Sequence, residues 1–442
     1  MHAPTRLIAA ALLCAGSAIA APTNVSLKFD FGPGPVAPGY TQVLPDMSCT
    51  SARGYGFEPG AKVEGVDRGG PDALREDFVT SDHPFDFTAR VPHEGNYRVT
   101  VTLGDAHRES TTCIKAELRR LMVKVRHTAP GEFATVSFIV NTRVPTINAV
   151  EGIKAGVVRL KAPRETTMEA WDWDDAITLE FNDVHPAVCA VEIEPVEVPT
   201  IYVLGDSTVC DQPREPYTSW GQMLTAFFKP EVAVANHAES GETYRDSIGR
   251  RRLDKIASLL QPGDWVLMQF GHNDQKQIAA HTGGPFTTYI QEIKRHVEEI
   301  RAHGGNPVIV SSMERRRFDE KGKLVPSLTE YAEASRKAAE EFHVPFIDLN
   351  AMSIRFYEAL GPKRSAVAFA APNGRVDNTH HDNYGAYQLA QCIVEAIREQ
   401  HLAIAKYIVD DFKGFDPSHP DDPDTFDIPP SGEYTNQRPL GD

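Results

Sequence analysis

The sequence predicts two domains in series, an all-β sandwich over residues 21–197 and an α/β domain over residues 198–412 with helices on both faces of a parallel sheet. The length of 442 residues, with 41% hydrophobic residues, is enough to bury two cores. Short alternating strands fill the first part, whereas strands alternate with helices in the second. Residues 413–442 are rich in Asp and Pro and lack periodicity, so we expect a tail that wraps the surface or is partly disordered.

The first 20 residues have the features of a cleaved signal peptide. They contain Arg6, an apolar run from Leu7 to Cys14 and the small-residue end Ala18-Ile19-Ala20. The mature chain is then expected to begin near Ala21 and to be secreted or periplasmic. No later segment approaches the roughly 18 consecutive apolar residues of a membrane span, so we expect no membrane partner.

The charge and the cysteine content argue against nucleic-acid binding, a zinc site and a fold that depends on disulfides. The formal net charge is −16, and loss of Arg6 makes the mature chain more acidic, which argues against nucleic acid as a partner. Without Cys14, five cysteines remain, with no short C-x-x-C spacing for zinc. We predict no metal, no cofactor and no dependence on a disulfide framework, although one disulfide among Cys49, Cys113 and Cys189 is left open.

The sandwich is predicted from short segments whose apolar residues alternate with polar ones, separated by Gly, Pro and Asn turns. No convincing amphipathic helix interrupts them. The predicted strands cover residues 25–32, 97–105, 121–127, 133–141, 176–183 and 188–196.

The period of the hydrophobic pattern changes after Pro199. Repeated β-α units predict a parallel sheet, in which ligands bind beyond the carboxyl ends of the strands. Strands are predicted at residues 200–205, 231–235, 264–270, 307–311 and 345–349, and helices at 218–228, 250–260, 286–303, 328–343 and 383–402.

Four polar blocks follow the predicted strands or precede the last helix, so they are expected to meet at one edge of the sheet. They are Gly205-Asp206-Ser207, Asn236-His237-Ala238-Glu239-Ser240-Gly241, Gly271-His272-Asn273-Asp274 and Asp377-Asn378-Thr379-His380. Taken alone, each block also fits an ordinary turn. All four in order, each beside the appropriate element, favour a catalytic site.

These blocks contain the parts of a serine esterase, which needs a nucleophile, a base, a carboxylate that orients the base and donors for the oxyanion. Ser207 is predicted as nucleophile, His380 as base and Asp377 as the carboxylate that holds His380. The backbone N–H groups of Ser207 and Gly241 and the side-chain amide of Asn273 are predicted to form the oxyanion hole.

The sequences GDST, NHAESG, GHND and DNTH resemble the conserved blocks of SGNH (GDSL-type) hydrolases over residues 199–412. This resemblance implies a three-layer, flavodoxin-like α/β/α domain, with the five residues above in the roles assigned to them. The preceding sandwich resembles the galactose-binding-like module of some bacterial members.

Within that superfamily, the blocks and the tail sequence FDPSHPDDPDTFDIPP are most similar to rhamnogalacturonan acetylesterases. The resemblance implies an esterase that removes acetyl groups from plant pectic polysaccharide through an acyl-enzyme. An esterase that acts on acetylated xylan or on lipid is the alternative. Glu242 and Thr243 depart from the family pattern, in which a small residue stands two positions after the glycine of the second block.

Several residues outside the blocks are candidates for binding a carbohydrate. Arg315 and Arg316, just past the fourth strand, are candidates for pairing with uronate carboxylates, as is the run 250–252, for which a solvated charge run is the favoured alternative. Trp171 and Trp173 are candidates for stacking on sugar, with burial in the sandwich as the alternative.

Two other functions compete with the esterase. A metallophosphoesterase is suggested by Asp105-x-His107 and Asp183-x-His185, but the order of His272 and Asn273 is reversed relative to its motif. A carbohydrate-binding protein with an inactive hydrolase domain is disfavoured by the complete catalytic set. Because every block follows Pro199, the hydrolase domain is expected to act on small esters without the sandwich.

Overall fold

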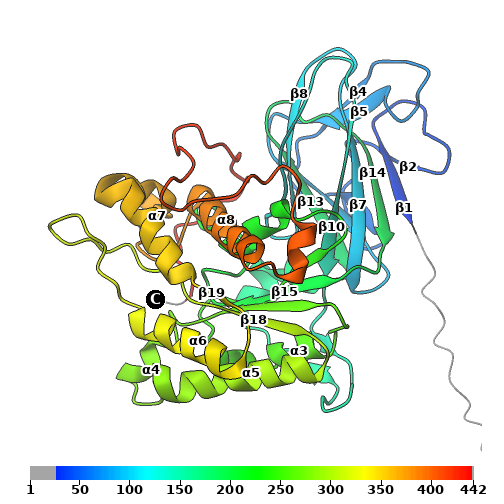
Figure 1. Ribbon diagram of the computed structural model, residues 1–442. Helices are drawn as coiled ribbons and strands as arrows, with labels where there is room; N and C mark the ends of the chain where they lie inside the picture. The colour runs from blue at the N-terminus through cyan, green and yellow to red at the C-terminus, as the bar shows by residue number, and fades with distance from the viewer. Residues whose placement is uncertain (1–25, 441–442) are drawn as a thin grey trace, which may run out of the picture.

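The computed structural model describes residues 26–440, so the predicted signal peptide lies outside the described residues. Within this range, no helix has the length and apolar character to cross a membrane. Figure 1 shows a β-sandwich at the upper right, built from the N-terminal part of the chain, beside an α/β domain built from the remainder.

Two antiparallel sheets form the sandwich, and phenylalanine rings pack between them. Phe87 of β6 (Phe85–Arg90) makes edge-on contacts with Phe29 and Phe31 of β1 (Leu27–Phe31), at 5.1 and 4.9 Å between ring centroids. One sheet has the order β10 (Ala134–Thr142), β7 (Gly95–Leu103), β14 (Val188–Pro195), β1 (Leu27–Phe31) and β2 (Thr41–Val43), and β5 (Asp77–Thr80), paired with β4 (Glu64–Asp67), also joins β14. The other has the order β3 (Tyr55–Phe57), β6 (Phe85–Arg90), β13 (Ala176–Asn182), β8 (Ser110–Ala116) and β9 (Arg120–Thr128).

The 158–175 segment departs from the all-β pattern. It follows the small hairpin of β11 (Thr146–Ile147) and β12 (Gly156–Val157) and contains the short helices η1 (Arg164–Met168) and η2 (Ala170–Trp173). Its side chains pair with both domains: Asp172 with Arg120 of the sandwich, and Lys161, Arg164 and Glu165 with the α/β domain, as described below. Sequence patterns did not predict helix here because these turns have no apolar stripe of their own.

The second domain is a five-stranded parallel sheet in the order β16-β15-β17-β18-β19. Each predicted strand is present, with ends shifted by a few residues. Alternate residues of β15 face opposite layers, since Ile201 and Val203 join one apolar cluster and Tyr202 and Leu204 another. The strands are β15 (Thr200–Gly205), β16 (Ala233–Asn236), β17 (Trp265–Gln269), β18 (Asn306–Val310) and β19 (Phe346–Ile347).

Helices cover both faces of this sheet, which confirms the three-layer α/β/α prediction (Figure 1). One face carries α1 (Trp220–Met223), η3 (Leu224–Phe227), α7 (Leu349–Arg364) and α8 (Asn383–Glu399), and the other carries α2 (Tyr244–Gly249), α3 (Arg252–Ala257), α5 (Ile290–Ala302) and α6 (Thr329–Phe342). Short turns complete the domain: α4 (Lys276–Ala279), η4 (Pro285–Tyr289), η5 (Ser365–Ala368), η6 (Pro372–Gly374) and η7 (Ala403–Tyr407). Helix α7 was not predicted, although Leu349, Met352, Phe356 and Leu360 recur at helical spacing.

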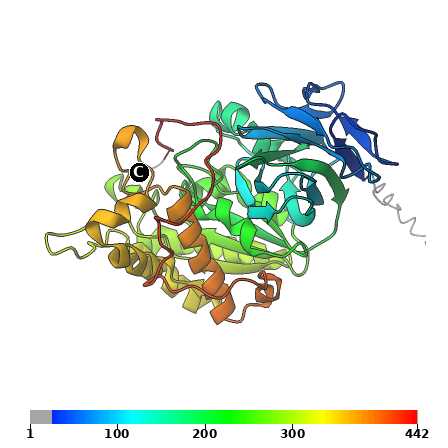
Figure 2. The same cartoon turned by 90° about the horizontal axis from the view of Figure 1, so that it is seen from above.

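The C-terminal segment, residues 413–440, has no helix or strand but follows a defined course along α8 (Figures 1 and 2). Asp421 accepts hydrogen bonds from Gln388 and Gln391 of α8, each at 2.9 Å. Farther on, the segment reaches the sandwich, where Lys115 donates to the carbonyl of Pro429 at 2.8 Å. The tail therefore touches both domains.

All five cysteines of the described residues are unpaired, which resolves the disulfide left open by the sequence.

Candidate active site

The polar blocks converge beyond the carboxyl ends of the sheet strands, and three of their side chains form a hydrogen-bonded chain. Ser207 Oγ lies 2.8 Å from His380 Nε2. His380 Nδ1 lies 3.1 Å from Asp377 Oδ2. All three residues are buried. This is the geometry that a nucleophile, its base and the orienting carboxylate require.

A tight turn after β15 presents Ser207. The carbonyl of Asp206 accepts hydrogen bonds from the backbone N–H groups of Val209 and Cys210, each at 3.0 Å. Gly205 is needed before the turn because a Cβ there would approach the carbonyl oxygen of Gln269 to 2.7 Å. The strand can therefore end against its neighbour and turn at once, which leaves the serine at the sheet edge.

Asp377 has a second charged partner besides His380. Arg438 of the C-terminal segment contacts both carboxylate oxygens, with Nε 2.6 Å from Oδ2 and Nη2 3.1 Å from Oδ1. Burial by itself would raise the pKa of Asp377, but the hydrogen bond and charge of His380, and then Arg438, hold this pKa well below its usual value. The group is therefore a carboxylate at neutral pH.

His381, the neighbour of His380 in the sequence, faces away from the serine. Its Nε2 lies 2.7 Å from the hydroxyl of Tyr357, and its ring packs on Phe369 with centroids 4.4 Å apart. Burial, followed by the charges of His380 and His272, lowers the pKa of His381 to about 3. His381 is therefore a neutral core residue.

Of the three predicted oxyanion residues, Ser207 lies in the turn after β15, Gly241 on the loop after β16 and Asn273 on the loop after β17. Gly241 has φ of 73°, a left-handed conformation that favours glycine. Asn273 is buried, and its Nδ2 donates to the carbonyl of Glu242 at 3.2 Å. Lys276 Nζ donates to Asn273 Oδ1 at 3.1 Å, which fixes the orientation of the amide.

A cavity of about 260 Å³ lies beside this constellation. Tyr217, which lines it, contacts the His380 ring edge-on at 5.9 Å between centroids. The 158–175 segment, the loop after Ser207 and the C-terminal segment form its walls. The cavity is lined by four cations and no carboxylate: Lys161, Arg164, Arg214 and Arg438.

The arginines proposed from the sequence lie elsewhere. Arg315 donates to Gln275 at 3.1 Å, and Arg316 donates to Asn378 at 3.1 Å, so both support the loops of the third and fourth blocks. Neither lines the 260 Å³ cavity. The run 250–252 is not a solvated charge run either, because Arg252 is buried and pairs with Glu165 at 2.6 Å.

The two tryptophans have different surroundings. Trp173 is buried, its Nε1 donates to Glu165 at 3.0 Å and the Arg143 guanidinium lies 4.6 Å from its ring, so it offers no face to a sugar. Trp171 is partly exposed and lines a second cavity of about 270 Å³, between the sandwich and the loop that holds Arg214.

The Asp-x-His pairs both lie in the sandwich, away from Ser207. Asp105 pairs with Arg68 at 2.9 Å and with His185 at 3.1 Å. In the metallophosphoesterase alternative, the Asp105 carboxylate would bind a metal ion. In the structure it is paired with Arg68 instead.

Sequence reasoning missed Lys161, Arg164, Arg214 and Arg438 as residues of the site. None belongs to a recognisable motif, and three of them lie more than 35 positions from the nearest block or beyond the last one. Only the folded chain brings them together.

Comparison with known proteins agrees with this architecture. Residues 203–389 match the GDSL-like lipase/acylhydrolase family, and residues 27–129 match the galactose-binding-like domain of β-agarase/YXIM esterase-like proteins. Rhamnogalacturonan acetylesterase RhgT of Bacillus subtilis is 37% identical over 227 residues, which cover 49% of this chain and 95% of the relative.

Two further Bacillus subtilis proteins are similar. The probable rhamnogalacturonan acetylesterase YesY is 30% identical over 47% of this chain and 97% of its own length. The uncharacterized esterase YxiM is 28% identical over 85% of this chain and 91% of its own length, so its similarity extends over the sandwich as well. The chain therefore belongs to the GDSL-like lipase/acylhydrolase family and is an ester hydrolase with an N-terminal galactose-binding-like domain.

Proposed function

We propose that the protein is a serine esterase that removes acetyl groups from an acidic plant polysaccharide of the pectic class, with rhamnogalacturonan as the expected polymer. The 2.8 Å approach of Ser207 Oγ to His380 Nε2 carries the catalytic part of this proposal. In the first step Ser207 Oγ attacks the acetyl carbonyl while His380 Nε2 takes its proton. His380 then returns the proton to the departing sugar oxygen, which leaves an acetyl-serine.

Water hydrolyses the acetyl-serine in a second step, with His380 again as the base. Asp377 keeps the proton of His380 on Nδ1 and stabilises the imidazolium that forms in each step. The N–H groups of Ser207 and Gly241 and the amide of Asn273 are proposed to bind the oxyanion. In such sites, loss of one donor typically lowers kcat by about 10²–10³, so Asn273→Ala is expected to lose activity on this scale.

The lining of the 260 Å³ cavity supports an acidic substrate. Four cationic side chains line this cavity and no carboxylate does. Each cation has a carboxylate partner outside the lining: the partners of Lys161 and Arg164 are buried, Arg214 pairs with Glu433 and Arg438 with Asp377. Guanidinium and ammonium groups bind carboxylates by charge-assisted hydrogen bonds. The names of RhgT and YesY support the same class of substrate.

Acetate release from matched polymers tests this proposal. Acetylated rhamnogalacturonan is expected to have a higher kcat/KM than acetylated xylan, which carries few charges. Arg214→Gln is expected to raise KM for the acidic polymer several-fold and to leave KM for the neutral one unchanged, because Arg214 lines the cavity without contacting the triad. Faster deacetylation of xylan, or an equal effect of Arg214→Gln on both polymers, would refute the acidic substrate.

A further inference from the structure

The 158–175 segment belongs to the sandwich in sequence, yet its cations pair with the loop that follows β16. Lys161 Nζ donates to the carbonyl of Ser240 and lies 3.0 Å from Glu242 Oε1. These two contacts fall on the residues directly before and after Gly241. One side chain of the sandwich therefore contacts the carbonyl of the peptide that carries the Gly241 N–H, and also the side chain of the residue after Gly241.

Glu242 is one of the residues at which the sequence departs from the family pattern, and its carboxylate lies among three cations. Its carboxylate has no exposed surface and lies 3.2 Å from Arg250 and 3.6 Å from Arg252, in addition to Lys161. Burial raises the pKa of Glu242, whereas Arg252 and Lys161 act to lower it. The carbonyl of Glu242 accepts from Asn273, so this residue also links the two proposed oxyanion loops.

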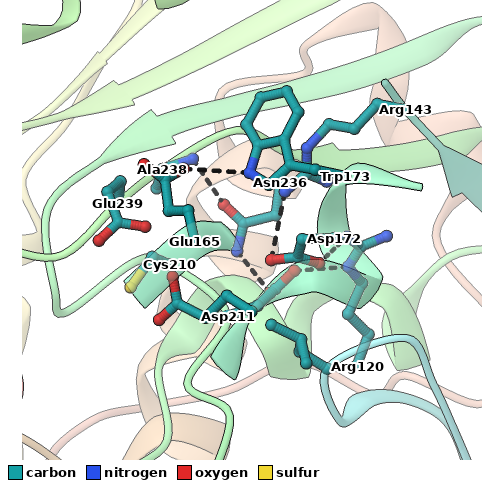
Figure 3. Close-up of polar contacts among 12 residues, drawn as sticks. Arg120, Arg143, Glu165, Asp172, Trp173, Cys210, Asp211, Asn236, Ala238 and Glu239 are labelled. Atoms are coloured by element: carbon teal, nitrogen blue, oxygen red, sulfur yellow. Dashed lines mark hydrogen bonds and ion pairs between the residues drawn. The ribbon is translucent and has the colours of Figure 1, made fainter. Parts of the chain in front are cut away.

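Lys161 is itself held in place. Its backbone N–H donates to Glu165 Oε2 at 2.6 Å, and the same oxygen accepts from Arg252 at 2.6 Å. Glu165 in turn accepts from Trp173 (Figure 3). Beside it, Arg164 pairs with Glu239 at 3.1 Å, and the backbone N–H of Glu239 donates to Gly205. The segment thus contacts the second block at Glu239 and Ser240, and Glu242 directly after it.

The backbone conformation makes such support necessary. Gly241 has no Cβ to restrict its dihedral angles, so the direction of its N–H depends on how the flanking peptides are held. An oxyanion donor must be aimed at the developing charge before the reaction begins. A tilt of one peptide plane would turn the N–H away from the acyl oxygen.

We propose that Lys161 is a positioning residue for the oxyanion hole, which holds Ser240 and Glu242 so that the Gly241 N–H faces the reacting ester at Ser207. This inference rests on the oxyanion assignment of Gly241 made above. It gives the sandwich a part in the catalytic site, apart from any binding of carbohydrate.

The test compares Lys161→Met and Lys161→Arg in the full chain, with Lys154→Met as matched control, because Lys154 is an exposed lysine close by in sequence. A small neutral acetate ester is the substrate, so binding of a polymer does not enter. Lys161→Met is expected to lower kcat by about 10- to 100-fold, since small misplacements at a catalytic site cost this much. KM should change little, Lys161→Arg should recover most of the rate, and Lys154→Met should match the wild type.

A tetrahedral adduct supplies a second readout. Phenylboronic acid, which forms such an adduct with an active serine, is expected to bind Lys161→Met more weakly in proportion to the loss of kcat. Folding of each variant is checked by its thermal midpoint. If Lys161→Met yields too little folded protein, Lys161→Gln, which keeps an N–H donor without the charge, is judged by the same criteria.

Unchanged kcat in folded Lys161→Met, or a rise in KM alone, would overturn the inference. The variant Asn273→Ala distinguishes two possible failures: that Lys161 has no positioning role, and that the oxyanion hole is assigned to the wrong residues. If Asn273→Ala loses about 10²–10³ in kcat while Lys161→Met does not, the oxyanion hole is supported and the role of Lys161 is refuted. If neither variant loses activity, the assignment of the hole is refuted as well.

Discussion

At the scale of single residues, His380 and His381 show how environment assigns roles to adjacent identical side chains. The ring of His380 lies between Ser207 and Asp377, whereas that of His381 lies in the core beside Tyr357. Both histidines are buried, so the direction of each ring, and not its burial, decides which one can take the proton of Ser207. The sequence assigned the base to His380 through the D-x-x-H spacing, and the structure places that imidazole at the serine.

Substitution of each histidine is expected to give opposite results. His380→Ala should lose nearly all kcat on a small acetate ester at every pH, because Ser207 loses its base. His381→Ala should keep most of its kcat but lose about 2–4 kcal/mol of stability, since it leaves a cavity and an unpaired Tyr357 hydroxyl. Steady-state kinetics and thermal unfolding measure the two effects. An inactive, folded His381→Ala beside an active His380→Ala would show that the base is misassigned.

Buried neutral histidines also predict how stability depends on pH. His296 of α5 bonds to Ser247 at 2.6 Å, and burial lowers its pKa to about 4. In the unfolded chain its pKa is about 6.5. Below that pH the unfolded state binds a proton that the folded state does not, so stability is lost as pH falls from about 6.5 toward 4.

His296→Gln is expected to remove this dependence. Over this pH window the slope of the unfolding free energy should become shallower by about 1.4 kcal/mol per pH unit, the contribution of one proton. Urea unfolding of variant and wild type at a series of pH values measures the difference. Parallel curves would show that His296 titrates alike in both states.

At the scale of elements, the C-terminal segment acts as a strap between the two domains. Lys115 of β8 donates to Pro429 and Ser431, at 2.8 and 2.7 Å, and Asn182 of β13 donates to Pro430 at 2.8 Å. Residues 433–435 exchange backbone hydrogen bonds with Glu215. The segment forms no helix or strand, and its hydrogen bonds go to other elements of the fold. Hydrophobic periodicity in the sequence does not reveal such contacts.

Deletion of residues 428–442 is expected to destabilise the protein by roughly 2–4 kcal/mol, because buried donors such as Lys115 lose partners. It should also raise KM for the acidic polymer, since Arg438 and one wall of the cavity are removed. Arg438→Gln serves as the comparison, and should raise KM with a smaller loss of stability, since the other contacts of the segment remain and Asp377 keeps its hydrogen bond to His380. If the deletion variant keeps the thermal stability and the KM of the wild type, the C-terminal segment is dispensable.

At the scale of the whole molecule, two adjacent arginines join the sandwich to the loop after Ser207. Arg120 is 1% exposed and pairs with Asp172 at 2.7 Å and with Asp211 at 2.6 Å, and Asp211 also accepts from Asn236 at 2.7 Å (Figure 3). Arg119 donates to the carbonyls of Gln212 and Tyr217. Sandwich residues Cys113 and Leu121 also lie in the core cluster of the hydrolase domain.

The sequence led us to expect that the hydrolase domain acts on small esters without the sandwich, whereas this interface leads us to predict the opposite. A fragment of residues 198–442 would lose the partners of Asp211, Glu239 and Glu242, all of which are buried on loops of the site. We expect its kcat on a small acetate ester to be at least about 10-fold below that of the full chain, by analogy with other misplaced catalytic groups. Co-expression with residues 26–197 should restore activity. A folded fragment with full activity would refute this dependence and the role of Lys161 together.

The sequence by itself predicted the sandwich followed by the α/β domain, the order of the strands along the chain, and a Ser207, Asp377 and His380 set whose side chains the structure brings within hydrogen-bond distance. It could do so because hydrophobic period, turn residues and compact motifs are local properties, and because parallel strands bring their carboxyl ends to one edge. Helix α7 also had such a local signal.

Tertiary structure alone decided what surrounds those residues. Lys161, Arg164 and Arg438 reach the site from segments with no motif, and Arg315, Arg316 and Trp173, which the sequence singled out, are engaged in protein contacts. The physical reason is that charge pairing acts through space. A buried carboxylate such as Glu242 requires a cation nearby in the fold, and nothing in the order of residues along the chain records that Lys161, 81 positions earlier, provides it.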